Sequence, residues 1–173
     1  MHASLTLDPL NANTLQSLSI PLYLSRDYPA ATSALRKSIA INPAIDASHF
    51  FLGAIELLGG HNDEAFKEFA AENKILNRDA GSALVNFALG NRPTSDVALA
   101  RLMREGGRIW PYGIAIVFAY RGETNDAFEW LEKAYESRDY DLQSFVRGDP
   151  LLMSLHGDVR WAALLKKMNL PYD

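Results

Sequence analysis

The sequence predicts an all-α fold, an array of antiparallel helix hairpins that ends in a capping helix. The first observation is a spacing of 34 residues between Pro9 and Pro43, which lie in the similar stretches SLTLDPLNANT and SIAINPAIDAS. The second is a small residue followed four positions later by a large one, which recurs at the same period: Ala31 and Leu35, then Ala65 and Phe69. The third is the recurrence of glycine-containing polar stretches that end apolar segments.

A period of this length indicates stacked helical hairpins. Small residues allow two antiparallel helices to cross closely, and large apolar residues fill the space between neighbouring hairpins. We therefore expect Gly53 and Ala65 at a helix crossing and Phe69 in the core. A proline can close each unit because it cannot continue the preceding helix.

The first two units are expected at residues 12–45 and 46–79. The first has helices near 13–25 and 29–41, and Pro21 should bend the earlier of them, because a straight helix there would lose about 3 kcal/mol. The second unit has helices at 47–58 and 63–76, on either side of the stop Gly-Gly-His-Asn at 59–62.

The third unit, residues 80–107, departs furthest from the pattern. Gly90 is the expected turn glycine, equivalent to Gly60, with helices near 80–89 and 95–105. The small and large places are then Ser95 and Leu99, and the alternative register uses Ala98 and Leu102.

The fourth unit, residues 108–139, returns to the pattern, with its turn at Gly122 and its second helix beginning at Asp126. Residues 140–173 do not repeat, and we expect them to cover the end of the array. This cap should hold a short helix near 142–147, a break at Asp149-Pro150 and a last helix that is capped by Asp158 and runs to Met168. The buried stripe of that last helix is predicted as Trp161, Leu164, Leu165 and Met168.

The chain is expected to form one domain, residues 1–173. Residues 1–11 have the pattern of the end of a second helix, because Pro9 takes the place of Pro43. We therefore expect a chain that begins inside a repeat, with Leu5 and Leu7 at an open edge.

The motif order in residues 52–69, Leu-Gly, a turn glycine and Ala-x3-Phe, resembles the tetratricopeptide repeat. Residues 111–171 resemble the C-terminal end of bacterial proteins in which such arrays follow a nucleotide cyclase, winged-helix or kinase domain. The resemblance implies a right-handed superhelix of about three to four repeats. It also implies a regulatory or assembly role in a larger signalling protein, and it places no catalytic residue in this chain.

Composition excludes several classes of function. Hydrophobic residues make up 48% and charged residues 22%, which is typical of a globular protein. A net charge of −4 argues against a nucleic-acid-binding surface, which needs clustered Lys and Arg. The absence of cysteine excludes thiolate chemistry, and the absence of a long apolar run argues against a membrane span. We therefore expect a cytoplasmic protein without nucleic-acid or membrane partners.

No motif in the sequence indicates catalysis. The histidines are scattered, and structural or surface roles are expected for them: His2, His49, His61 and His156. The pair Gly106-Gly107 lacks the Lys and Ser/Thr of a phosphate loop and is expected to end a helix. We predict no catalytic, metal or cofactor site, and hence no enzyme. The alternatives are an enzyme whose cyclase or kinase domain lies N-terminal to this chain, and an active site in the helical concavity.

A partner-binding groove is predicted on the concave side, which the first helix of each hairpin should line. Its residues are Gln16, Ile20, Tyr23, Phe50, Ala54, Leu57, Leu84, Phe87, Tyr112, Ile116 and Tyr120. The Lys, Asn and Arg residues that hold a peptide carboxylate in chaperone-binding members of the family are missing from these places. An apolar groove favours an amphipathic or hydrophobic segment of a protein partner, or a second copy in a homodimer. The alternative is that these side chains are packing between hairpins.

Overall fold

The computed structural model describes residues 11–171. Within that range the chain forms eleven helices and no strand. The predictions for Leu5, Leu7 and Pro9 lie outside the described residues. The predicted all-α fold is confirmed for the part of the chain that is described.

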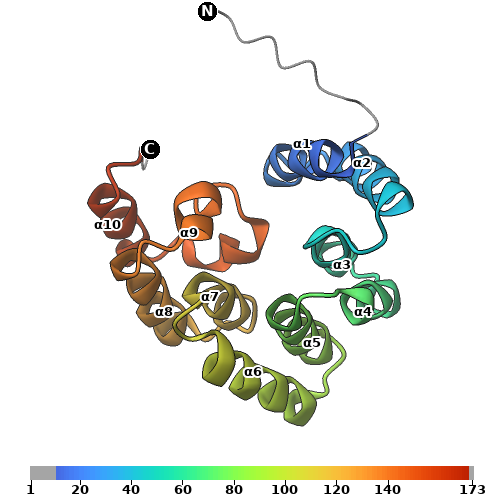
Figure 1. Cartoon of the computed structure of the whole chain (residues 1–173). Helices are drawn as coiled ribbons and strands as arrows, with labels where there is room; N and C mark the ends of the chain where they lie inside the picture. Colours follow the sequence, from blue (N-terminus) through green and yellow to red (C-terminus); the bar gives the residue numbers. More distant parts are fainter. Residues whose placement is uncertain (1–10, 172–173) are drawn as a thin grey trace, which may run out of the picture.

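Consecutive helices pair as hairpins (Figure 1). The pairs are α1 (Ala12–Leu24) with α2 (Tyr28–Ile41), α3 (Ser48–Leu58) with α4 (Asn62–Ala71), α5 (Ile75–Ala88) with α6 (Arg92–Gly106), and α7 (Pro111–Tyr120) with α8 (Thr124–Glu136). The remainder forms α9 (Tyr140–Phe145), the 3₁₀ helix η1 (Pro150–Leu155) and α10 (Val159–Lys167). The array of sequential hairpins is therefore as predicted.

The four hairpins share one turn geometry. Gly60, Gly90 and Gly122 have φ values of 78°, 75° and 75°, and each follows the C-cap of the first helix. Their N–H groups, and those of the following residues, donate to the last carbonyls of that helix, as in a Schellman motif. Arg26 takes the same place in the first hairpin with a φ of 65°, where a side chain costs about 1 kcal/mol.

The small and large places are buried in every hairpin. The small residue lies five positions after the turn residue and the large one nine positions after it: Ala31 and Leu35, Ala65 and Phe69, Ser95 and Leu99, Ala127 and Leu131. The hydroxyl of Ser95 donates to the carbonyl oxygen of Ala83 at 2.6 Å, so it is satisfied in the core. The register with Ser95 and Leu99 follows the same offset as the other hairpins, although Ala98 and Leu102 are also buried.

Phe69 fills the space between neighbouring hairpins, as its place in the pattern predicts. A Cβ on Gly53 of α3 would lie 2.6 Å from the Phe69 ring, and one on Gly81 of α5 would lie 2.2 Å from it. The two glycines therefore allow α3 and α5 to pack closely against the Phe69 ring of α4.

The predicted helices 63–76 and 80–89 are wrong at their adjoining ends. The first ends at Ala71 and the next begins at Ile75. The cause is Glu72, which has extended backbone and is 1% exposed. Its carboxylate accepts the N–H of Phe50 at 3.0 Å and the N–H of Lys74 at 3.0 Å. The buried carboxylate of Glu72 thus accepts backbone N–H groups at the starts of α3 and α5, and the extended backbone at Glu72 ends α4 at Ala71.

Other differences concern helix ends and the cap. The second helix of the fourth hairpin begins at Thr124 rather than Asp126, and Pro21 lies within α1 without ending it. The sequence pattern missed η1, which follows the break at Asp149. The last helix, Val159–Lys167, has Asp158 as its N-cap and Met168 as its C-cap, so the predicted cap at Asp158 is confirmed.

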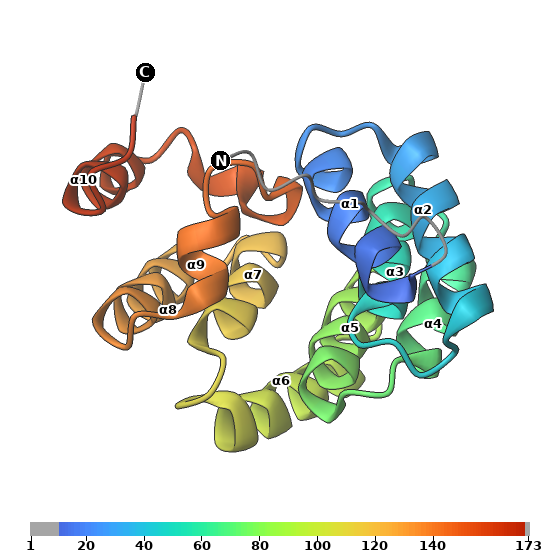
Figure 2. The ribbon, with the colours of Figure 1, turned by 45° about the horizontal axis from the view of Figure 1, so that its top comes forward.

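The hairpins follow an arc, and the non-repeating segment turns back into it (Figures 1 and 2). The ring of Phe145 lies 6.3 Å from that of Phe51 and 6.4 Å from that of Tyr112, between ring centroids. Gly148 lies against Leu24 at the end of α1. Residues 140–150 therefore occupy part of the concave side, while α10 packs over α8, where the Tyr135 hydroxyl donates to the carbonyl of Lys167.

Candidate functional site

A central pocket of about 210 Å³ lies between α1, α3, α7 and α9. Six residues of the predicted groove line it: Gln16, Ile20, Tyr23, Phe50, Tyr112 and Ile116. The other five lie elsewhere: Ala54, Leu57 and Leu84 are buried in the core, and Phe87 and Tyr120 face each other with ring centroids 6.4 Å apart. The structure thus brings together groove residues of α1, α3 and α7 but not those of α5.

The remaining lining residues were missed by the sequence analysis. They are Ala47, Phe51, Asn77, Trp110, Tyr140, Asp141, Phe145 and Asp149. Half of them come from residues 140–149, which carry no repeat signal, so their place inside the arc had no periodic pattern to reveal it.

Asp149 lines the pocket and connects helices that are distant in the sequence. It is 5% exposed and accepts the hydroxyl of Tyr112 at 2.7 Å, the hydroxyl of Tyr23 at 3.2 Å and the N–H of Leu151 at 3.0 Å. Burial raises the pKa of Asp149, although these three hydrogen bonds oppose the shift. Burial and the nearby Asp149 raise the pKa of both tyrosines well above the ordinary value. Both hydroxyls therefore remain donors at neutral pH.

Asp141 and Trp110 form the second polar contact of the pocket. The indole Nε1–H of Trp110 donates to Asp141 Oδ2 at 2.7 Å. Burial raises the pKa of Asp141, and the neighbouring Asp139 and Asp149 add to this, whereas the indole hydrogen bond lowers it. The indole ring is fixed against the backbone of Gly113, where a Cβ would lie 2.2 Å from it.

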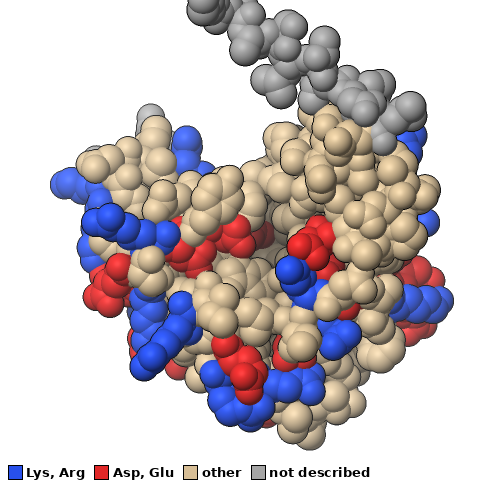
Figure 3. All heavy atoms as spheres, viewed as in Figure 1, with Lys and Arg blue, Asp and Glu red and all other residues tan. Residues whose placement is uncertain are grey.

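The pocket wall is electronegative. Asp139 accepts the backbone N–H of Tyr112 at 3.0 Å and that of Asp141 at 2.9 Å, so a third carboxylate lies next to the pocket. Within residues 11–171, no Lys, Arg or His nitrogen comes within 4.0 Å of a carboxylate oxygen of Asp139, Asp141 or Asp149. Figure 3 shows acidic side chains beside the central hollow next to α9, and basic ones on the outer edge and on the opposite side of the hollow.

An outer hollow of about 550 Å³ continues from the central pocket and shares Asn77, Trp110 and Asp141 with it. It extends over two exposed isoleucines, Ile75 at 58% and Ile109 at 73% exposure. Asp46 and Lys74 lie at its edge and pair with each other at 3.2 Å. The two cavities together give a narrow polar-aromatic pocket with an open apolar extension.

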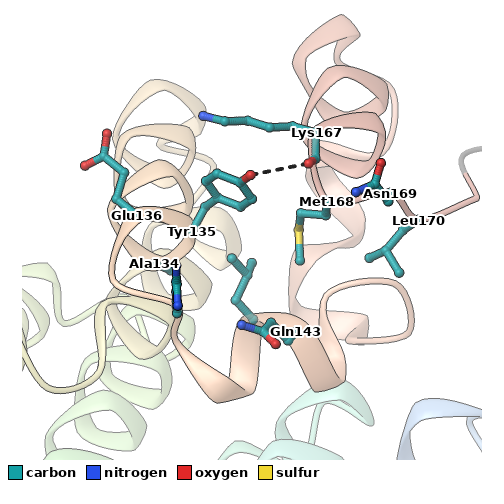
Figure 4. A pocket seen from close by; sticks show the side chains of 10 residues that line it. Ala134, Tyr135, Glu136, Gln143, Lys167, Met168, Asn169 and Leu170 are labelled. Atoms are coloured by element: carbon teal, nitrogen blue, oxygen red, sulfur yellow. Dashed lines mark hydrogen bonds between the residues drawn. The ribbon is translucent and has the colours of Figure 1, made fainter.

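A separate hollow of about 570 Å³ lies between α8, α9 and α10 (Figure 4). Tyr135, Met168 and Leu170 line its apolar part. The ammonium of Lys167 pairs with Glu132. No acid and base that line this hollow form a salt bridge with each other among the residues described.

The histidines and glycines singled out in the sequence have structural places. His49 lies 2.8 Å from Glu68, His61 lies 2.9 Å from Glu56, and His156 stacks on Trp161. Gly107 is the C-cap of α6. His2 lies outside the described residues. Across residues 11–171 there is no cluster of three or more His, Asp or Glu placed to hold a metal ion.

Two further findings do not concern a single site. No helix in the described part of the chain is long and apolar enough to cross a membrane. Comparison with protein-family models, with curated proteins and with solved structures finds no match to this chain. The assignment that stands is therefore an all-helical protein of paired consecutive helices.

Proposed function

We propose that this chain is a non-catalytic protein-binding module that holds a segment of a partner at the central pocket. The observation that carries the proposal is the convergence of side chains from α1, α3, α7 and α9 on one open, aromatic-lined pocket. Concave pockets with apolar walls and a few placed polar groups are the usual form of a binding site. The two acids nearest the cavity are held by hydrogen-bond donors of the protein itself, which suits recognition better than proton transfer.

The hairpin geometry supports a tetratricopeptide-like array as the scaffold. Three turn glycines with φ near 75° and four buried small-and-large pairs occur at equivalent places. Arrays of this kind present the first helix of each hairpin on a concave surface, and a right-handed superhelix is the form that the resemblance implies. We also propose a regulatory or assembly role in a larger bacterial signalling protein, which the same resemblance implies.

The proposal is tested by site-specific photo-cross-linking in cells that express the protein. Tyr140 lies on the rim of the pocket at 76% exposure, so a benzoylphenylalanine there should form a covalent adduct with one partner polypeptide. The same group at Val97, which is 68% exposed on α6, should form none. Replacing Gln16 with Trp fills the pocket and should reduce the adduct at least about tenfold, because central contacts dominate interface energetics.

The control for the filling variant is Asn13→Trp, which adds the same ring to the exposed side of α1. It should leave both the adduct and the thermal unfolding midpoint unchanged. Equal adducts at Tyr140 and Val97, or a Tyr140 adduct that Gln16→Trp leaves intact, would contradict the proposal. An adduct between two copies of this chain would identify the partner as a second copy, in a homodimer.

A further inference from the structure

The central pocket combines aromatic walls with carboxylates for which its lining offers no basic side chain. Seven of its lining residues are aromatic: Tyr23, Phe50, Phe51, Trp110, Tyr112, Tyr140 and Phe145. The ionisable groups that line it are Asp141, Asp149 and the tyrosine hydroxyls, with no Lys, Arg or His among them. Asp139 adds a third carboxylate beside Asp141.

Such a lining favours a cation. The face of an aromatic ring attracts a positive charge, and the attraction grows when water is displaced. Carboxylates in a concave site with low-dielectric walls concentrate a negative potential there. An anionic group would meet repulsion from three aspartates, and a neutral group would leave their charge uncompensated.

We infer that the central pocket receives the cationic side chain of a lysine or arginine in the partner segment, with Asp141 as its charged contact. The inference rests on the proposed function and names the chemistry of the partner. A volume of about 210 Å³ suits one side chain and lies below the usual range for small-molecule sites. Asp141 is half-buried where the two cavities meet, and its side chain accepts one hydrogen bond, from the Trp110 indole to Oδ2. Asp149 already accepts two tyrosine hydroxyls and the N–H of Leu151.

The outer hollow identifies the source of the cation as a polypeptide. A free organic cation needs only the aromatic rings and carboxylates of the central pocket and would leave the outer hollow empty. The hollow continues past Trp110 and Asp141 to the exposed side chains of Ile75 and Ile109, which offer contact to an apolar residue next to the inserted one. A segment with a basic residue beside an apolar one matches both cavities.

The test uses the full chain and an immobilised array of nonapeptides with a fixed central residue and flanks drawn from apolar and neutral amino acids. The centres are Lys, Arg, norleucine and Glu. Lys or Arg centres should bind at least about tenfold more tightly than norleucine centres of the same flanks, and Glu centres should not bind. Asp141→Asn keeps an oxygen for the Trp110 indole, and it should reduce the preference for Lys over norleucine to less than about threefold.

The matched control is Asp126→Asn, which removes the same charge from an exposed position on α8 and should leave the preference unchanged. Binding that is indifferent to the central charge, a preference unchanged in Asp141→Asn, or no binding to any Lys or Arg centre would overturn the inference. Stronger binding of tetramethylammonium than of any peptide would overturn the polypeptide source.

The outcomes separate the inference from the proposed function. One outcome would support the binding module and contradict the inference about a cationic side chain. In it, a partner cross-links at Tyr140 and no longer does so in Gln16→Trp, yet it binds equally well after its basic residues are replaced by norleucine. If no cross-link forms at Tyr140, both the proposed function and the inference that rests on it would be contradicted.

Discussion

Replacing Asp149 with Ala should lower the free energy of unfolding by about 2–4 kcal/mol. The change leaves the buried hydroxyls of Tyr23 and Tyr112 without their acceptor, and each unsatisfied group costs about 1–3 kcal/mol. It also removes the contact that ties η1 to α1 and α7. Chemical denaturation followed by circular dichroism measures the loss, and a loss below about 0.5 kcal/mol would show that the tyrosines do not depend on this carboxylate.

The matched variant is Asp149→Asn, which keeps an acceptor for one tyrosine and removes the buried charge. It should therefore cost less than Asp149→Ala at neutral pH. The raised pKa of Asp149 in the folded protein sets the sign of the pH dependence. Its contribution to stability is fully present below the ordinary pKa near 3.8 and is lost as the pH rises through the folded value. The free energy of unfolding of the native protein should therefore rise relative to that of Asp149→Asn as the pH falls through that window. A difference in unfolding free energy that does not change with pH would contradict the assignment.

Replacing Phe69 with Ala should lower the free energy of unfolding by about 3–5 kcal/mol, because the ring is 1% exposed and fills the space between α3 and α5. Gly81→Ala should lower it by about 1–3 kcal/mol, since the added Cβ would lie 2.2 Å from that ring. Both are measured by denaturant unfolding at neutral pH.

Coupling between these positions provides the control. In Gly81→Ala combined with Phe69→Leu, the smaller side chain can move away from the new methyl group. The double variant should therefore lose at least about 0.5 kcal/mol less unfolding free energy than the sum of the losses measured for Gly81→Ala alone and Phe69→Leu alone. Strict additivity would mean that Gly81 is needed for some reason other than the approach of the Phe69 ring.

The hairpin array could be predicted from the sequence because its signals are local and repeated. Glycine at positions 60, 90 and 122 marks turns that need positive φ, and the small-and-large pairs follow at a fixed offset. The prediction failed at Glu72 because a glutamate on a helical pattern gives no sign that its carboxylate will be buried against the N–H of Phe50. The contact joins residues 22 positions apart and depends on the finished packing of α3 and α4.

The candidate site could be predicted only in part. The concave position of Tyr23, Phe50 and Tyr112, which line the pocket, could be predicted because each lies on the inward face of the first helix of a hairpin. Asp141 and Asp149 were missed because residues 140–150 follow no repeat, and a cap was expected over the end of the array. Their place inside the arc follows from long-range contacts, such as the hydrogen bond between Tyr23 and Asp149, 126 residues apart.

The most direct measurement of cation binding at the central pocket is a titration of the ¹⁵N-labelled protein, followed by the three tryptophan indole resonances. Trp110 donates its indole N–H to Asp141, whereas Trp130 lies under Lys133 and Trp161 stacks on His156, so the latter two are internal references. A lysine-centred peptide should shift the Trp110 indole signal saturably and leave the other two in place, and the norleucine peptide should shift none of them. A Trp110 signal that does not respond to the lysine-centred peptide, or that responds equally to norleucine, would contradict the assignment.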